Sequence, residues 1–121
     1  MKHLFLMATM LLMFGAANAQ ISDIKQNGSI VYVYGENNKE LSRTTLYTDY
    51  EVKGWGNSFF VVQKNTIVMV YDQNCKEGSR MTLSSEKHNV KSASGNSFNV
   101  SDGIMMYTYD KNCKEISRRN L

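Results

Sequence analysis

Proline is absent from the chain of 121 residues, so no turn can rely on the residue whose ring fixes the backbone angle φ. The turns must be built from Gly, Asn, Asp and Ser, which tolerate left-handed backbone or hydrogen-bond their own main chain. Cysteine and histidine each occur only twice. A zinc site needs about four ligands, and no group with that spacing is present, so we predict no metal and no cofactor.

Signatures of catalysis are lacking as well. No serine lies in a Gly-x-Ser-x-Gly elbow, which marks the nucleophile of many hydrolases. His88 is the only histidine beyond the first few residues, and we interpret it as a loop residue. The pairs Asp72-x-Asn74 and Asp110-x-Asn112 have too few carboxylates for a calcium loop and are typical of turns held by Asp and Asn side chains. We therefore predict no catalytic residues.

A large excess of one charge is also missing. Lys and Arg together number 14 against 11 Asp and Glu, whereas nucleic-acid-binding domains concentrate basic residues on one face. We predict no nucleic-acid partner.

The only long hydrophobic run lies at the N-terminus. Leu4–Phe14 follows the positively charged start Met1–His3 and is shorter than the roughly 20 residues that a membrane-spanning helix needs. Ala17–Ala19 then forms a small-x-small cleavage site. This order is that of a secretory signal peptide, so we predict that residues 1–19 are removed. An uncleaved membrane anchor is the alternative.

Cleavage would leave residues 20–121 as a single domain in a periplasm or outside the cell. The cleavage site has no cysteine for lipid attachment, and no later hydrophobic run would hold the mature chain in a bilayer. We therefore predict an exported protein that is not a lipoprotein and has no stable membrane insertion.

A pattern of roughly 38 residues recurs along the mature chain, which is how repeat architectures are recognised. Each copy is an apolar stretch followed, after a short turn, by Lys-Glu-x-Ser-Arg. The copies are Ile30–Tyr34 with Lys39–Arg43, Ile67–Tyr71 with Lys76–Arg80, and Met105–Tyr109 with Lys114–Arg118. A second landmark, Gly-Asn-Ser-Phe, occurs at Gly56–Phe59 and at Gly95–Phe98.

The repeated segments have the composition of β-strands. Ile30–Tyr34 and Ile67–Tyr71 are rich in β-branched and aromatic residues and are bounded by turn formers. Both are apolar on their two alternating faces, which favours strands that are covered on both sides, or strands whose second face meets another copy of the chain. Phe59–Gln63, joined to Ile67–Tyr71 by a short connection, predicts a β-hairpin.

Further strands complete each repeat. Ser79–Leu83 predicts a third strand, Tyr50–Trp55 and His88–Ser92 predict a weaker fourth, and Ile21–Gln26 predicts the opening strand of the first repeat. The fold class is therefore all-β, an antiparallel meander of about ten short strands in two full repeats and one partial repeat. A closed barrel and a β-trefoil-like body are the alternatives.

The order of strand, Tyr-Asp turn and Lys-Glu resembles the blade repeats of β-propeller proteins over Phe59–Arg80 and Phe98–Arg118. In this respect the chain is similar to small exported bacterial repeat proteins, a resemblance that implies blade-like units and no particular activity. Asn38, Cys75 and Cys113 occupy the position where such blades have glycine. Three units are fewer than the four or more blades of a ring, so a propeller would require several chains.

Cys75 and Cys113 lie in equivalent turns of the second and third repeats. In an exported protein this placement favours a disulfide between them. Free thiols and a bridge between two chains are the alternatives.

Two sets of side chains are candidates for ligand binding. Stacked repeats would align the basic residues into a cationic stripe able to bind anionic glycans or phosphates: Lys39, Lys76, Lys114, Arg43, Arg80 and Arg118. The alternative is that Glu40, Glu77 and Glu115 neutralise the stripe as cross-strand partners.

The second set is aromatic. Trp55 lies between Gly54 and Gly56, which predicts a flexible, exposed turn, and Tyr47 and Tyr50 are close in sequence. Exposed aromatic rings bind sugar rings or partner proteins. The alternative is that Trp55 folds into the core.

These observations predict an exported, non-enzymatic binding module whose ligand is a glycan or a protein. The first alternative is an envelope structural protein that self-assembles into a homo-oligomer. The second is a secreted enzyme, a hydrolase using His88, or an inhibitor of a secreted enzyme.

Overall fold

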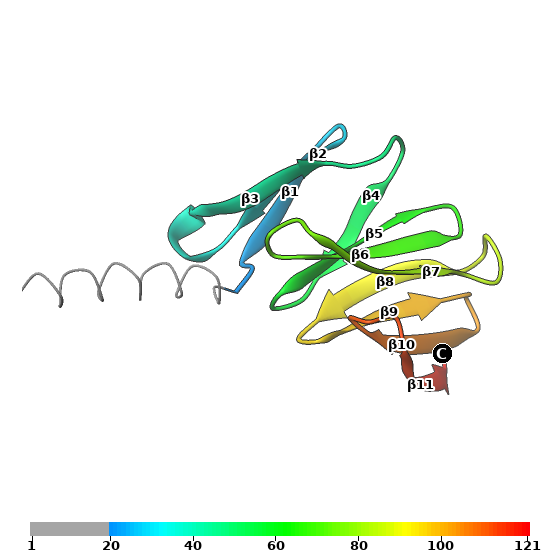
Figure 1. Cartoon of the computed structure of the whole chain (residues 1–121). Coiled ribbons are helices and arrows are strands. Elements are labelled where there is room, and N and C mark those ends of the chain that lie inside the picture. Colours follow the sequence, from blue (N-terminus) through cyan, green and yellow to red (C-terminus); the bar gives the residue numbers. More distant parts are fainter. Residues whose placement is uncertain (1–19) are drawn as a thin grey trace, which may run out of the picture.

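The computed structural model describes residues 20–121, so the predicted signal peptide lies outside the described residues. Over this range the protein is all-β, as predicted: eleven antiparallel strands form three sheets, with one short 3-10 turn at Glu36–Asn38 (Figure 1).

Each sheet is a meander of consecutive strands. The N-terminal sheet contains β1 (Asp23–Asn27), β2 (Ile30–Tyr34) and β3 (Glu40–Thr45). The middle sheet contains β4 (Glu51–Trp55), β5 (Phe59–Lys64), β6 (Ile67–Asp72) and β7 (Glu77–Thr82). The C-terminal sheet contains β8 (Asn89–Ser94), β9 (Ser97–Ser101), β10 (Met105–Asp110) and β11 (Glu115–Asn120). Every repeat thus has its own sheet, and over residues 20–121 the strands do not join into one closed barrel.

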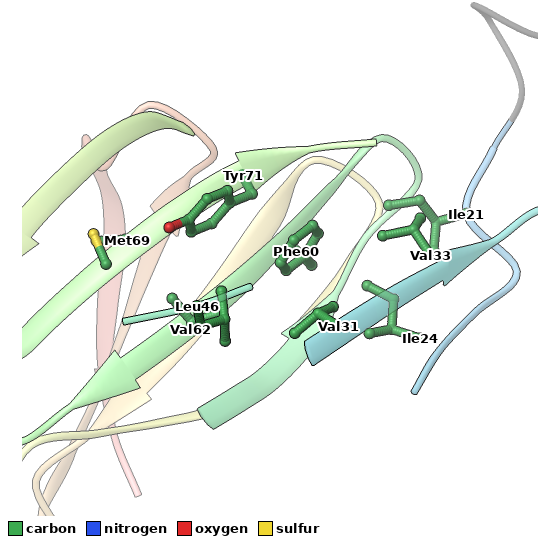
Figure 2. Close-up of a cluster of buried hydrophobic side chains, with 9 residues drawn as sticks. All are labelled: Ile21, Ile24, Val31, Val33, Leu46, Phe60, Val62, Met69 and Tyr71. Carbon is green, nitrogen blue, oxygen red and sulfur yellow. The ribbon is translucent and has the colours of Figure 1, made fainter. Parts of the chain in front are cut away.

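The three sheets follow one another in space, and the middle sheet lies between two hydrophobic cores (Figure 1). The first core joins the N-terminal and middle sheets (Figure 2) and consists of Ile21, Ile24, Val31, Val33, Leu46, Phe60, Val62, Met69 and Tyr71. The second core joins the middle and C-terminal sheets and consists of Phe59, Val61, Val68, Val70, Leu83, Val90, Phe98 and Val100. Because successive strand residues point to opposite faces, β5 and β6 supply side chains to both cores.

Two-sided burial is confirmed for Ile67–Tyr71, in which the residues from Val68 onward are buried. In Ile30–Tyr34 only one face is covered within residues 20–121: Val31 and Val33 are buried, whereas no other sheet covers the opposite face with Tyr32 and Tyr34. The cause is position in the stack, because the first sheet has a neighbour on one side only. Contact of that second face with another copy of the chain stays a prediction.

We call the face of a sheet that points to the preceding sheet its upstream face, and the opposite one its downstream face. Phe60 pairs with Tyr71 in the middle sheet, and Phe98 pairs with Tyr109 in the C-terminal sheet. The two phenylalanines are therefore at equivalent positions on the upstream faces of their sheets. In the N-terminal sheet the residue paired with Tyr34 at this position is Asp23. At this position the upstream face of the N-terminal sheet, which faces solvent, has a polar residue, whereas the upstream faces of the other two sheets have phenylalanine.

The last downstream face is polar in the same way. Val61 pairs with Val70 in the middle sheet, and the equivalent pair in the C-terminal sheet is Asn99 with Thr108. The Thr108 hydroxyl donates to Asn99 Oδ1 at 2.7 Å. Both outer faces thus have polar residues at positions that are apolar on the inner faces, a feature typical of the terminal units of repeat proteins.

The Gly-Asn-Ser-Phe landmark is offset by one residue in the structure. Phe98 occupies the position of Phe60 rather than that of Phe59, since Ala93 pairs with Phe98 as Trp55 pairs with Phe60. The two turns have equal length between these pairs, and the motif begins one residue later in the C-terminal hairpin. Both rings stack on the paired tyrosine, with centroids 5.2 Å apart for Phe60–Tyr71 and 5.5 Å for Phe98–Tyr109.

Gly54 and Gly56 allow close approach of two sheets, which corrects the prediction of a flexible turn around Trp55. A Cβ at Gly54 would lie 3.0 Å from the main-chain nitrogen of Ala93 in β8. A Cβ at Gly56 would overlap the Phe59 ring and the carbonyl oxygen of Gly95. These glycines are needed because β4 and β8 pack backbone to backbone.

A glutamine side chain connects each sheet to the start of the next. Gln63 Oε1 accepts the N–H of Val90 at 2.9 Å, and its Nε2 donates to the carbonyl oxygen of His88 at 3.1 Å. Gln26 makes the equivalent bonds to Val52 and Tyr50, both at 2.9 Å. The repeat therefore encodes a polar clamp that sets the spacing between neighbouring sheets.

Candidate functional site

The repeated turns are closed by their aspartates, as predicted. Asp72 Oδ1 accepts the N–H groups of Asn74 and Lys76 at 2.8 and 3.0 Å. Asp110 forms the same two bonds with the third repeat's turn. Cys75 and Cys113 follow in left-handed backbone, with φ of 63° and 64°. The aspartates are thus occupied in holding the turns.

Cys75 and Cys113 are free thiols in the structure, so the favoured disulfide is not formed. Each cysteine packs against a different core: Cys75 against the first and Cys113 against the second. Cys75 Sγ also lies 3.1 Å from the Ser42 hydroxyl of the preceding sheet. Equivalent turns point in the same direction along the stack, and therefore their thiols do not face each other.

Burial should make Cys113 slow to alkylate. It raises the pKa of the Cys113 thiol to about 11, and the thiolate is the reactive form. The loss of thiolate is partly offset because thiols of higher pKa are better nucleophiles. We expect iodoacetamide at pH 8 to label native Cys113 on the order of tenfold more slowly than the urea-unfolded chain. Mass spectrometry of timed samples measures both rates, and equal rates would contradict the partly buried position of Cys113.

The three repeated arginines are each paired with a glutamate of their own strand. The Arg–Glu nitrogen–oxygen distances are 2.8 Å for Arg43–Glu40, 2.6 Å for Arg80–Glu77 and 2.9 Å for Arg118–Glu115. The predicted alternative, that glutamates neutralise the arginines, is confirmed for these three arginines. The glutamates are, however, on the same strand as the arginines and not on the neighbouring one. A register shift in each hairpin places the two side chains together. The arginines therefore form no free cationic stripe.

The lysines lie apart from these ion pairs. Lys39, Lys76 and Lys114 are exposed in the turns that precede β3, β7 and β11. Their carbonyl oxygens accept the N–H groups of Gly35, Asp72 and Asp110, which closes each turn. The structure thus separates the predicted basic set into exposed turn lysines and ion-paired arginines.

The arginines differ in what lies beneath them. Arg43 lies over the ring of Tyr32 and Arg118 over that of Tyr107, at 4.9 and 5.2 Å from the ring centroids. The residue paired with Arg80 is Met69. The tyrosines nearest in effect to Arg80 belong instead to the loop between β3 and β4, and they act on its charge from a distance.

Tyr47 and Tyr50 of that loop are near enough to Arg80 for their charges to affect it. Their ring centroids are 6.1 Å apart. The hydrogen bond with Glu77 raises the pKa of the Arg80 guanidinium, and both tyrosines lie close enough to raise it further. Tyr47 is 63% exposed. We call the surface formed by Tyr47, Tyr50, Glu77 and Arg80, at the junction of the N-terminal and middle sheets, the tyrosine rim.

The junction of the middle and C-terminal sheets has a similar arrangement, with other residue types at the equivalent positions. A groove of about 320 Å³ between the middle and C-terminal sheets is lined by residues that include His88, Tyr107, Glu115 and Arg118. His88 takes the place of Tyr50, since each lies two residues before the N–H that a clamp glutamine binds. The Tyr107 ring contacts both His88, at 5.6 Å between centroids, and Arg118. The Tyr107 ring is therefore already in contact with residues of this junction, which leaves less of it available to a ligand.

Trp55 is separate from the tyrosine rim. It ends β4, whereas Tyr50 precedes that strand, so the two are about 17 Å apart at 3.3 Å per residue. Trp55 is partly buried, pairs with Phe60 and packs against the first core. The structure therefore brings Tyr47 and Tyr50 together with Arg80, and places Trp55 elsewhere.

His88 contacts a serine and an aspartate. Its Nδ1 lies 3.1 Å from Ser85 Oγ and its Nε2 lies 3.8 Å from Asp102 Oδ2. In serine hydrolases the serine meets Nε2 and the aspartate meets Nδ1, which is the reverse. Ser85 also accepts the N–H of Lys87, and the N–H groups of Met105 and Ile104 lower the pKa of Asp102. We interpret these contacts as a link between the loop after β7 and the C-terminal sheet.

Comparison with known proteins assigns no family: no family model matches the chain, and no curated protein matches it. Among residues 20–121 there is no cluster of three or more His, Cys, Asp or Glu that could hold a metal ion. The same residues include no helix long and apolar enough to cross a membrane.

Sequence reasoning missed the clamp glutamines and one cavity-forming glycine. Gln26 and Gln63 carry no recognised motif, although their equivalence follows once strand register is known. Gly78 stands where the other repeats have Leu41 and Ile116. That break in the repeat was visible in the sequence and indicates a local departure from the packing of the other units.

Proposed function

We propose that this protein is an exported, non-enzymatic binding module that holds a neutral glycan at the tyrosine rim. The observation that supports this is the exposed Tyr47 ring beside Tyr50 and the Arg80–Glu77 ion pair. Export rests on the predicted signal peptide, and a periplasmic or extracellular location is part of the proposal.

The chemistry of the rim suits sugar rings. The apolar C–H face of a pyranose stacks on exposed aromatic rings, which combine an apolar body with a polar tip. Arginine and glutamate together supply fixed donors and acceptors for hydroxyl groups. Because Glu77 neutralises Arg80 at 2.6 Å, the rim attracts a phosphate or sulfate less than a free arginine would.

The sheets support this role as a scaffold. We propose that each repeat is a blade-like unit of the β-propeller type, stacked in a row of three. Binding residues on loops gain precision when a rigid framework holds the loop ends. Here β3 and β4 hold both ends of the loop with Tyr47 and Tyr50.

A glycan array probed with residues 20–121 tests the proposal. We expect binding to at least one neutral glycan, and a loss of about tenfold or more in Tyr47→Ala, because truncating a central aromatic contact removes much of the binding energy. Tyr34→Ala, on the outer face of the N-terminal sheet, is the matched control and should bind normally.

Two outcomes contradict the proposal. Binding to no glycan at all would exclude the ligand class. Equal losses in Tyr47→Ala and Tyr34→Ala would show that the rim is not the site. Trp55→Ala is uninformative, because Trp55 packs against the first core.

A further inference from the structure

A hollow of about 430 Å³ opens between the middle and C-terminal sheets, at the turn end of β6 and β7. Its lining includes the buried side chains of Phe59 and Val70. Ser79, Lys111 and Asn112 are the polar contributors from β7 and the facing turn. Cavities of this size, apolar within and polar at the mouth, are typical of small binding sites.

Gly78 is the reason that the hollow exists. A Cβ at this position would meet only the carbonyl oxygen of Val70, at 3.6 Å, and otherwise open space. Neither steric crowding nor a left-handed backbone therefore requires glycine there. The absent side chain leaves unfilled space at this end of the junction.

The preceding junction shows what fills such a space. Leu41 is equivalent to Gly78, and its side chain packs against the first core, where it lies over Gly35. Beside it, the Ser42 hydroxyl donates to the carbonyl oxygen of Gln73 at 2.6 Å. Where Leu41 is present, the two sheets close on each other through a leucine side chain and this hydrogen bond.

The equivalent hydroxyl in the second junction lacks that bond. Within residues 20–121, Ser79 makes no hydrogen bond to the turn that contains Lys111 and Asn112. The hollow therefore offers an apolar site with ample room for a leucine side chain, and the Ser79 hydroxyl lies at its mouth.

An open strand edge lies beside the hollow. β7, which contains Gly78 and Ser79, is the outer strand of the middle sheet, and within residues 20–121 it pairs with β6 alone. Outer strands have unpaired main-chain N–H and C=O groups that an extended peptide can bind. A peptide added there would direct alternate side chains toward the hollow.

We propose that β7 binds an extended polypeptide segment whose leucine or isoleucine side chain occupies the hollow at Gly78. The aliphatic side chain replaces the one that Leu41 supplies in the preceding junction. The peptide main chain pairs with the edge of β7, and Ser79 binds a peptide polar group at the mouth. This site is on the downstream side of the middle sheet and is independent of the proposed glycan site.

The test uses the acetylated and amidated pentapeptide Ser-Thr-Leu-Thr-Ser, titrated into the ¹⁵N-labelled protein and followed by NMR. We expect saturable shifts at the amides of Gly78, Ser79 and Val70. The peptide with glycine in place of leucine should bind at least tenfold more weakly, and so should the peptide N-methylated at leucine, because it loses a main-chain donor.

Variants separate the hollow from other surfaces. Gly78→Leu should abolish peptide binding by filling the site and should not lower the thermal midpoint, because Leu41 is accommodated at the equivalent position. Gly78→Ala, a smaller change with room for its Cβ, should weaken binding and serves if Gly78→Leu fails to fold. Tyr47→Ala should bind the peptide normally, which keeps this test distinct from that of the glycan site.

Three results would overturn the proposal. Equal affinities of the leucine and glycine peptides would exclude the hollow as a site for an aliphatic side chain. No effect of N-methylation would exclude strand addition and leave a site for small molecules only. Undiminished binding to Gly78→Leu would place the peptide elsewhere.

Discussion

Gly56→Ala should destabilise the protein by about 3 kcal/mol or more, since overpacking of a tight site costs this much when backbone must move. The new Cβ would overlap the Phe59 ring, which is buried, and the Gly95 carbonyl oxygen. That carbonyl accepts the N–H of Asn57 at 2.9 Å. Relief of the overlap therefore requires β4 and β8 to separate and weakens a hydrogen bond between the sheets.

Urea unfolding followed by Trp55 fluorescence measures the effect. Gly78→Ala is the matched control, because its Cβ enters open space, and it should change the free energy of unfolding by less than about 1 kcal/mol. If Gly56→Ala were as stable as Gly78→Ala, the close contact of the middle and C-terminal sheets at this point would be wrong.

Gln63→Ala should lower the free energy of unfolding by about 3 kcal/mol, because each buried polar group left without a partner costs about 1–3 kcal/mol. Gln63 is 4% exposed. Its amide binds Val90, His88 and also the carbonyl oxygen of Asn65, at 2.7 Å. Alanine removes all three bonds and leaves the main chain at the start of β8 unsatisfied.

Hydrogen exchange gives this prediction a local signature. The amide of Val90 should exchange faster in Gln63→Ala even under conditions where the protein stays folded. Gln26→Ala, at the equivalent clamp, should cost less, because Gln26 is only partly buried. Unchanged exchange at Val90 would show that the clamp does not hold the C-terminal sheet.

The strands of this protein could be predicted from local composition. Phe59–Gln63 and Ile67–Tyr71 are apolar on both faces and bounded by turn formers, so the hairpin β5–β6 followed directly. The aspartate-closed turns followed from the same logic, since Asp72 and Asp110 precede the residues they bind. Such features depend on residues close together in the chain.

Features that depend on contacts between sheets could not be predicted. The glycines around Trp55 indicated a flexible turn, whereas the proximity of Ala93 and Gly95 explains them. The pairing of Cys75 with Cys113 was inferred from equivalent turns, but equivalence does not fix direction. Arg43 and Glu40 share a strand, and only the register shift in β2–β3 brings them together.

The candidate site was predicted in part. Tyr47, Tyr50 and Arg80 were all candidates, and the structure places them at one junction. Trp55 was the leading residue and lies at the far end of β4. Sequence proximity was misleading because an extended strand separates its two ends by many ångströms.

The polar residues on the outer faces of the first and last sheets bear on where further repeats could be inserted into this fold. Within residues 20–121, only the middle unit has buried apolar side chains on both faces, so a duplicated copy inserted beside it would meet matching surfaces on either side. Asp23 at one end and Asn99 at the other would remain as terminators. A chain with such an added middle unit would therefore keep the same two outer faces, whatever its length.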